Sequence, residues 1–193
     1  AILLPFLMSM VILSYIVYAL LSAENGLVNN SILPLFHIDS IQWYQEPKYW
    51  PVILIIANCW KGVGYGCLIY IASLIGIDPS FYEAARLDGA SKWQEITKIT
   101  LPSLVPTIIT LLLLSIGRIF YSDFGLFYQV PMNSGVLFPT TNVIDTYVYR
   151  ALIEQGNISM SSAAGVYQSL VGFCVVMLSN WIVRKVDKDQ ALF

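Results

Sequence analysis

The sequence has 193 residues, of which 57% are apolar and only 11% are charged, and its formal net charge is −2. Soluble domains carry about 45–50% apolar and about 25% charged residues. This composition therefore excludes a disordered chain, a basic nucleic-acid-binding protein and nearly every soluble enzyme.

The apolar residues are gathered in runs long enough to cross a bilayer, which takes about 20 residues. The runs lack the period-two alternation of membrane β-barrels, so the expected fold is an all-α, polytopic bundle of transmembrane helices. We expect about four spans, over residues 2–22, 51–76, 103–127 and 161–183. Because the sequence opens with Ala1 inside an apolar run, we interpret the chain as lacking its natural N-terminus.

The distribution of lysine and arginine predicts the orientation of these spans. Six basic residues lie on one side and two on the other: Arg86, Lys92 and Lys98 in the loop 78–101 and Arg184, Lys185 and Lys188 in the tail 184–193, against Lys48 and Arg150 in the remaining loops. Basic residues favour the cytoplasmic side. The loop 78–101 and the tail are therefore predicted to be cytoplasmic.

The other two loops are then extracytoplasmic. Loop 24–50 carries five aromatic residues that fit a belt at the lipid headgroups: Phe36, Trp43, Tyr44, Tyr49 and Trp50. In loop 128–160, a short helix over 142–155 is expected to be closed by Gly156.

The cytoplasmic loop carries the strongest local signals in the chain. Asp78 is a good helix N-cap, Pro79 suits the first helical position, and Gly89 stands where a helix would end in the left-handed conformation. Ser91 and Gln94 have the spacing of a capping box, which predicts a second short helix. That helix is expected to stop near Leu101, before Pro102.

The loop 78–102 is thus predicted to be a helix, a sharp turn and a helix. One face of the first helix would present Phe81, Ala84, Ala85 and Asp88, and one face of the second would present Trp93, Ile96 and Thr100. The two alanines would let another surface approach closely. Either this face meets a partner protein or the loop packs on its own chain.

The loop also resembles the EAA signature of the permeases of binding-protein-dependent ABC importers, the MetI-like superfamily. The match rests on Glu83-Ala84-Ala85, on Gly89, and on Ile99-x-Leu101-Pro102. Ile96 departs from the pattern, because an aromatic residue often stands there. By resemblance, the residues that couple the permease to an ATPase are Glu83, Ala84, Ala85, Asp88, Gly89, Ala90, Ile99, Leu101 and Pro102.

The resemblance extends over essentially the whole chain. Residues 60–65, 143–150 and 180–181 are similar to the LplB-like polysaccharide and oligosaccharide permeases. Such permeases usually have about six spans, so the resemblance implies that the first two are missing here.

The family implies a set of partners for a permease in the bacterial inner membrane. Cytoplasmic ATPase subunits would bind ATP and Mg²⁺, a second permease would complete a heterodimer, and an extracytoplasmic binding protein would deliver the sugar. This chain itself is expected to bind no cofactor and to catalyse no reaction, because it has no Walker motif. No metal site is expected either, since the single histidine, His37, has no cysteine or acidic cluster around it.

Charged residues inside spans are costly and often mark a polar path. The candidates for a translocation path are Asn58, Lys61, Tyr65, Arg118, Tyr121 and Asp123. Alternatively, the charges form structural pairs, for example Lys61 with Asp123. The alternating Gly62, Gly64 and Gly66 favour close helix packing over a phosphate loop.

Two other classes of membrane protein would leave different signatures in the sequence. A stand-alone secondary transporter or channel would be expected to show inverted repeats, and none is evident. An intramembrane enzyme would need a catalytic or zinc constellation at membrane depth, which the sequence lacks. The sequence does not identify the sugar.

Overall fold

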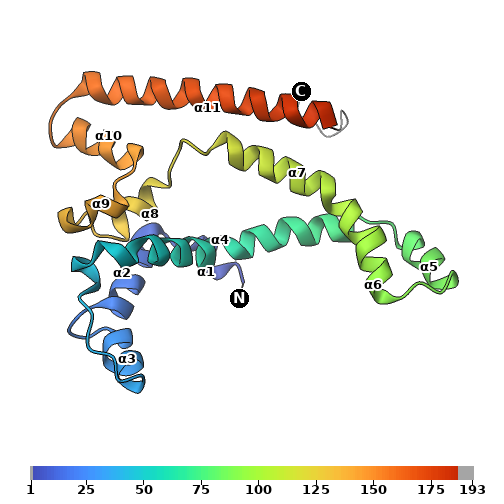
Figure 1. Cartoon of the computed structure of the whole chain (residues 1–193), viewed down its shortest axis with the longest axis horizontal. Coiled ribbons are helices and arrows are strands. Elements are labelled where there is room, and N and C mark those ends of the chain that lie inside the picture. The colour runs from blue at the N-terminus through green and yellow to red at the C-terminus, as the bar shows by residue number, and fades with distance from the viewer. Residues whose placement is uncertain (1, 187–193) are drawn as a thin grey trace. The chain divides into compact units, whose positions relative to one another are not determined.

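The computed structural model describes residues 2–186, and every regular element in this range is a helix (Figure 1). The part of the expected tail beyond residue 186 lies outside this range. In chain order the elements are α1 (Leu4–Leu7), α2 (Met10–Leu21), η1 (Val28–Ile32), α3 (Leu33–Leu35), η2 (Trp43–Gln45), η3 (Pro47–Tyr49), α4 (Trp50–Ile75), α5 (Pro79–Leu87), α6 (Lys92–Glu95), η4 (Ile96–Thr100), α7 (Leu101–Gly117), α8 (Phe124–Gln129), η5 (Gly135–Leu137), α9 (Phe138–Thr141), α10 (Ile144–Ile153) and α11 (Ile158–Val186).

The chain divides into two units, which are described separately. Unit one comprises Ala1–Gly64 and Tyr121–Gln168, and unit two comprises Tyr65–Phe120 and Ser169–Phe193. The long helices α4 and α11 each contribute to both units.

Within residues 2–186, three helices are long and apolar enough to cross a membrane: Pro47–Ile75, Lys92–Gly117 and Ile158–Lys185. They confirm the expected all-α membrane fold and lie at three of the four expected spans. The fourth apolar helix, Met10–Leu21, is shorter. At 1.5 Å per residue its 12 residues extend about 18 Å, less than the bilayer core.

The expected continuous span 2–22 is therefore wrong. Helix α1 ends at Leu7, and the backbone is extended at Met8 and Ser9. The Ser9 side chain accepts a hydrogen bond from the amide of Ile12, at 3.2 Å, and so acts as the N-cap of α2. A hydroxyl that can cap a new helix competes with continuation of the old one.

The expected span 103–127 is also divided. Helix α7 ends at Gly117, and α8 begins only after Asp123, whose carboxylate accepts a hydrogen bond from the amide of Leu126 at 3.0 Å. Between the two helices, the amide of Ser122 donates to the Asp145 carboxylate at 2.6 Å. The acidic side chains give these amides partners that helix continuation would otherwise supply.

The opposite correction applies before Pro102, where a stop was expected. The chain stays helical from Lys92 to Gly117, through the five-residue π-helical segment η4. In this segment the amide of Leu101 donates to the carbonyl of Ile96, and Pro102 follows within the first turn of α7. The wider π turn accommodates a proline that an α-helix interior would exclude.

The core of unit one forms around Trp50, which is fully buried among Leu13, Val17, Leu54 and Val130. Its indole N–H donates to the carbonyl of Trp43 at 2.8 Å. The aromatic residues of loop 24–50 thus do not all lie in a headgroup belt, because Trp50 belongs to the core. A buried indole needs a hydrogen-bond acceptor, and the folded loop provides it.

Asn29 holds the same loop together from the inside. Its buried amide group donates to the carbonyl of Ile41 at 2.9 Å and accepts from the Trp43 indole N–H at 2.9 Å. Nothing in the sequence distinguishes Asn29 from its exposed neighbour Asn30.

Arg150 organises the segment between α8 and α11. Only 8% of this residue is exposed, and its guanidinium donates to Asn133 Oδ1 at 2.9 Å, to Asn142 Oδ1 and to Thr146 Oγ1 at 3.2 Å. It also lies 4.1 Å from the centre of the Phe138 ring. The helix expected here is confirmed as α10, followed by Gly156 at φ +62°. A buried arginine held by neutral oxygens and a ring makes this segment rigid.

We expect Arg150→Met to lower the thermal unfolding midpoint of the detergent-solubilised protein. The substitution removes the charged donor to the Asn133 and Asn142 amide oxygens and to the Thr146 hydroxyl, and hydrogen bonds to a charged group contribute about 1.5–3 kcal/mol each. Arg184→Met, at an exposed arginine, is the matched control and should leave the midpoint unchanged. Equal midpoints for the two variants would show that the Arg150 contacts do not stabilise the segment.

Candidate functional site

The loop between α4 and α7 starts with a well-capped helix. The Asp78 carboxylate accepts a hydrogen bond from the amide of Ser80 at 2.9 Å, and this bond lowers the pKa of Asp78. At the other end of α5, Gly89 has φ +75° and the amide of Ala90 donates to the carbonyl of Ala85 at 2.9 Å. The expected N-cap and glycine terminus are confirmed, and a β-branched residue at Gly89 would be strained.

The second helix begins with the expected capping box. The Ser91 hydroxyl accepts from the amide of Gln94 at 3.4 Å, while the Gln94 side chain accepts from the amide of Ser91 at 2.7 Å. Both helices of the turn are therefore fixed at their starts by their own side chains. Figure 1 shows α5 and α6 joined by this turn.

Two side-chain contacts that the sequence did not reveal tie α5 to the following helix. Glu95 is buried and contacts Arg86 Nε at 3.0 Å and Lys92 Nζ at 2.9 Å. The Tyr82 and Thr100 hydroxyl groups lie 2.9 Å apart. The loop therefore packs on itself through Tyr82, Arg86 and Glu95.

The opposite side of α5 is open and partly apolar. Phe81 is 60% exposed and Leu87 is 89% exposed, with exposed Ala84 and Asp88 beside them. Ala85 is half-buried and so is turned away from this surface, contrary to the face expected from spacing alone. We call Phe81, Ala84, Leu87 and Asp88 the α5 outer face.

The other residues assigned to coupling by resemblance surround this helix. Glu83 is exposed on α5, Ala90 is half-buried in the turn, and Ile99 is half-buried in η4. Leu101 and Pro102 are exposed at the start of α7. Thr100 does not share an outer face with Trp93 and Ile96, because its hydroxyl meets Tyr82.

The candidate path residues do not gather into one site within either unit. Asn58, Lys61, Tyr121 and Asp123 belong to unit one, whereas Tyr65 and Arg118 belong to unit two. Tyr65 and Tyr121 are both exposed.

Lys61 has a structural role in unit one. Its ammonium group donates to the backbone carbonyls of Pro5 at 3.4 Å, Phe6 at 3.1 Å and Met8. Pro5, Phe6 and Met8 lie at or just after the end of α1, where a cation is favourable. Lys61 is not paired with Asp123 in the described structure, since Asp123 caps α8 instead.

Arg118 is the C-cap residue of α7 rather than a residue inside a span. Its side chain is exposed, and within the described residues of unit two no acceptor is bound to its guanidinium. It therefore stays a candidate path residue, at a different position from the one expected.

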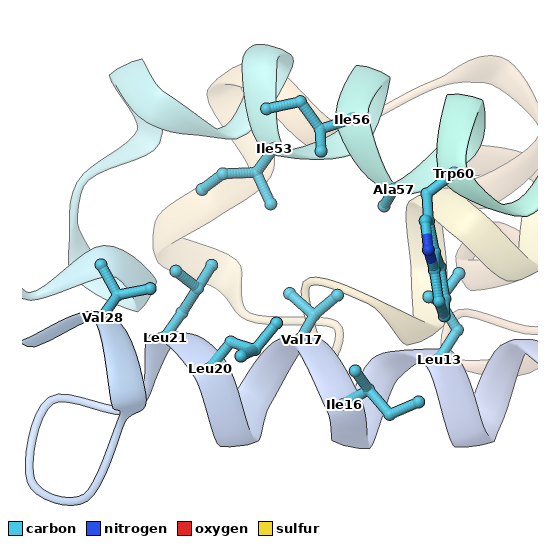
Figure 2. A pocket seen from close by; sticks show the side chains of 10 residues that line it. All are labelled: Leu13, Ile16, Val17, Leu20, Leu21, Val28, Ile53, Ile56, Ala57 and Trp60. Atoms are coloured by element: carbon cyan, nitrogen blue, oxygen red, sulfur yellow. The ribbon is translucent and has the colours of Figure 1, made fainter. Parts of the chain in front are cut away.

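Asn58 lines a pocket of 290 Å³ in unit one, together with Pro51, Leu54, Ile55, Leu126, Phe127 and Thr140. A larger groove of 480 Å³ runs between α2 and α4, where the side chains drawn in Figure 2 point toward one another. All ten residues lining that groove are apolar: Leu13, Ile16, Val17, Leu20, Leu21, Val28, Ile53, Ile56, Ala57 and Trp60. The Trp60 indole N–H is the one polar side-chain group among these ten residues (Figure 2).

The alternating glycines of α4 are not equivalent. A Cβ atom on Gly64 would collide with the backbone of Ile2, whereas Gly62 and Gly66 have no heavy atom within 4 Å of that position. Close packing through small residues is thus confirmed at Gly64 alone among the three.

The sequence matches the family of binding-protein-dependent transport system inner membrane components over residues 1–188. The chain belongs to this family.

Curated relatives include a polygalacturonan/rhamnogalacturonan transport system permease protein, YteP, and Protein LplB, both of Bacillus subtilis (strain 168). YteP is 33% identical over 190 residues, and LplB is 31% identical over 185 residues. Each match covers 96% of this chain and 57% of the relative, so the chain spans little more than half the length of either protein.

The fold is also similar to a solved structure of a bacterial alginate ABC transporter in complex with an alginate pentasaccharide-bound periplasmic protein. The match has a TM-score of 0.89 at 34% identity and covers 97% of this chain and 64% of that chain. This similarity confirms the MetI-like helical bundle.

Lys61→Met is predicted to lower the thermal unfolding midpoint of the purified protein, because the carbonyls at the end of α1 lose their donor. Hydrogen bonds to a charged group contribute about 1.5–3 kcal/mol each, which sets the scale of the expected loss. Arg118→Met is the matched comparison, since it removes an exposed cation with no such contacts. A Lys61→Met protein as stable as Arg118→Met would contradict the capping role.

Proposed function

We propose that this chain is the transmembrane permease of an ATP-driven ABC importer in the bacterial inner membrane. It would translocate an oligosaccharide or related sugar handed over by an extracytoplasmic binding protein. The observation that carries the proposal is the capped loop with its exposed α5 outer face, at the position of the EAA signature.

The names of the relatives support a carbohydrate as the transported solute. One relative is the permease of a polygalacturonan/rhamnogalacturonan transport system, and the structural neighbour transports alginate. Both names refer to acidic polysaccharides. A carbohydrate, and first of all an oligosaccharide of uronic acids, is therefore the solute to test.

The exposed α5 outer face supports the proposal that a cytoplasmic protein binds to this loop. An exposed leucine and phenylalanine on a rigid helix gain about 1.5–3 kcal/mol each when a groove buries them. We propose that an ATPase subunit, which itself holds ATP and Mg²⁺, provides this groove. A second permease chain would complete the pore as a heterodimer, and each permease would present one such helix to the ATPase dimer.

A stand-alone secondary transporter or channel is the alternative proposal. It would have no use for an exposed, well-capped cytoplasmic helix, so the two proposals differ in what a change on α5 does to transport.

Leu87→Ser should weaken ATPase binding by about tenfold or more, because about 1.5 kcal/mol of apolar burial is lost. Leu87 is exposed, so folding should not change. The assay is binding-protein-stimulated ATP hydrolysis and oligosaccharide uptake by the complete importer in proteoliposomes. Leu87→Met, which keeps the apolar area, is the control. Uptake that needs no ATPase, or that Leu87→Ser leaves unchanged, would favour the stand-alone transporter.

The proposal also fixes the sidedness of the loops. We expect Ser80→Cys on α5 to resist a membrane-impermeant thiol reagent in intact cells, and Ser31→Cys on η1 to react with it. Both serines are exposed and the substitutions are nearly isosteric. The background would carry alanine in place of the free Cys59, Cys67 and Cys174. Labelling of Ser80→Cys from outside would overturn the orientation and the ATPase contact together.

A further inference from the structure

Glu95 has an environment unlike that of any other acidic side chain in the loop 78–102. Its side chain is 6% exposed, while the two cations that hold it, Arg86 and Lys92, remain 58% and 73% exposed. Lys92 contacts both carboxylate oxygens, at 3.1 and 2.9 Å, and Arg86 Nε contacts Oε1 at 3.0 Å. The carboxylate is thus the buried centre of a three-residue cluster, which we call the Glu95 clasp.

The clasp joins elements on either side of the sharp turn. Arg86 lies on α5, Lys92 and Glu95 lie on α6, and Glu95 is the last residue before η4. Because α6, η4 and α7 form one continuous helix, the carboxylate connects α5 directly to the base of a membrane span.

A second contact supports the same junction. The Tyr82 hydroxyl of α5 meets the Thr100 hydroxyl at the end of η4, at 2.9 Å, and Thr100 also donates to the carbonyl of Glu95 at 3.4 Å. Two ties separated by one helical turn prevent α5 from pivoting on α6, whereas a single tie would leave one axis of rotation free.

We propose that Glu95 is a positioning residue that locks α5 to the α6–α7 helix, so that displacement of α5 moves the span as one rigid body. The effect on transport rests on the proposed function. The attachment of α5 to the α6–α7 helix by Glu95 does not, because it involves this chain alone. Glu95 acts through Arg86 and Lys92.

Loss of the Glu95 charge should change the position of α5 more than it changes folding. Arg86 and Lys92 are largely exposed, so water solvates them when the carboxylate is removed. Glu95→Gln keeps the shape of the side chain and removes its charge. The helices, which have their own caps, should therefore persist while the angle between them becomes variable.

The first experiment measures the lock without any transport assay. Amide hydrogen exchange of residues 79–90 would be followed in the intact permease complex without nucleotide. Glu95→Gln should speed exchange in this segment by about threefold or more, the factor expected for losing a partly exposed ion-pair cluster. Glu24→Gln, at an exposed glutamate of the extracytoplasmic loop, is the matched control. Unchanged exchange in Glu95→Gln would overturn the lock.

The second experiment measures the consequence of the lock as sugar imported per ATP hydrolysed by the complete importer. Glu95→Gln should lower this ratio while ATPase affinity for the permease stays the same, and Glu95→Asp should restore part of it. If Glu95 only stabilised the fold, Glu95→Gln would reduce the amount of assembled importer, and the complexes that do assemble would import as much sugar per ATP as the wild type. If Glu95→Gln exchanges faster but imports as much sugar per ATP as the wild type, the proposed transmission of movement from α5 to the span would be overturned.

Arg86→Met removes the α5 partner of Glu95 and should speed amide exchange in residues 79–90 even if Glu95→Gln does not assemble. Arg86 is more than half exposed, and the double variant Arg86→Met/Glu95→Gln should be no worse than Glu95→Gln, because the two residues share one interaction. Additive effects would contradict the clasp. If the wild-type protein recruits no ATPase, the proposed function fails, and the exchange experiment still decides whether Glu95 locks α5.

Discussion

The requirement that every backbone group in a membrane have a hydrogen-bond partner governs this structure. A continuous helix meets it automatically, so each interruption needs a replacement partner. Lys61 supplies donors to the carbonyls at the end of α1, Asp145 accepts from the amide of Ser122 after α7, and a π turn carries the chain past Pro102. This requirement accounts for the positions of Lys61 and Asp145 beside the interrupted helices.

The parts of the fold that could be predicted from sequence are those whose causes are local. Asp78, Gly89 and the Ser91–Gln94 pair act on backbone groups within three residues, or through their own φ angle. The long apolar runs are equally direct, because a helix of that length and composition has few alternatives in a bilayer. Both features were visible without knowing what packs against what.

The features that could not be predicted depend on partners distant in sequence. The break after α1 involves Lys61, 56 residues from Pro5, and the end of the third apolar run involves Asp145, 23 residues from Ser122. Hydropathy alone cannot distinguish a lysine that lines a pore from one that caps a helix, or a buried Asn29 from an exposed Asn30. Glu95 looked like an ordinary surface residue, because its burial depends on the turn bringing Arg86 back toward it.

The contacts that shape the loop 78–102 are close together along the chain: 9 residues separate Arg86 from Glu95 and 18 separate Tyr82 from Thr100. Short loops close quickly and at low entropic cost. The segment can therefore reach its native conformation soon after residue 100 leaves the ribosome, before α11 has been synthesised. A nascent chain would then carry a folded loop 78–102 while the later helices are still being inserted.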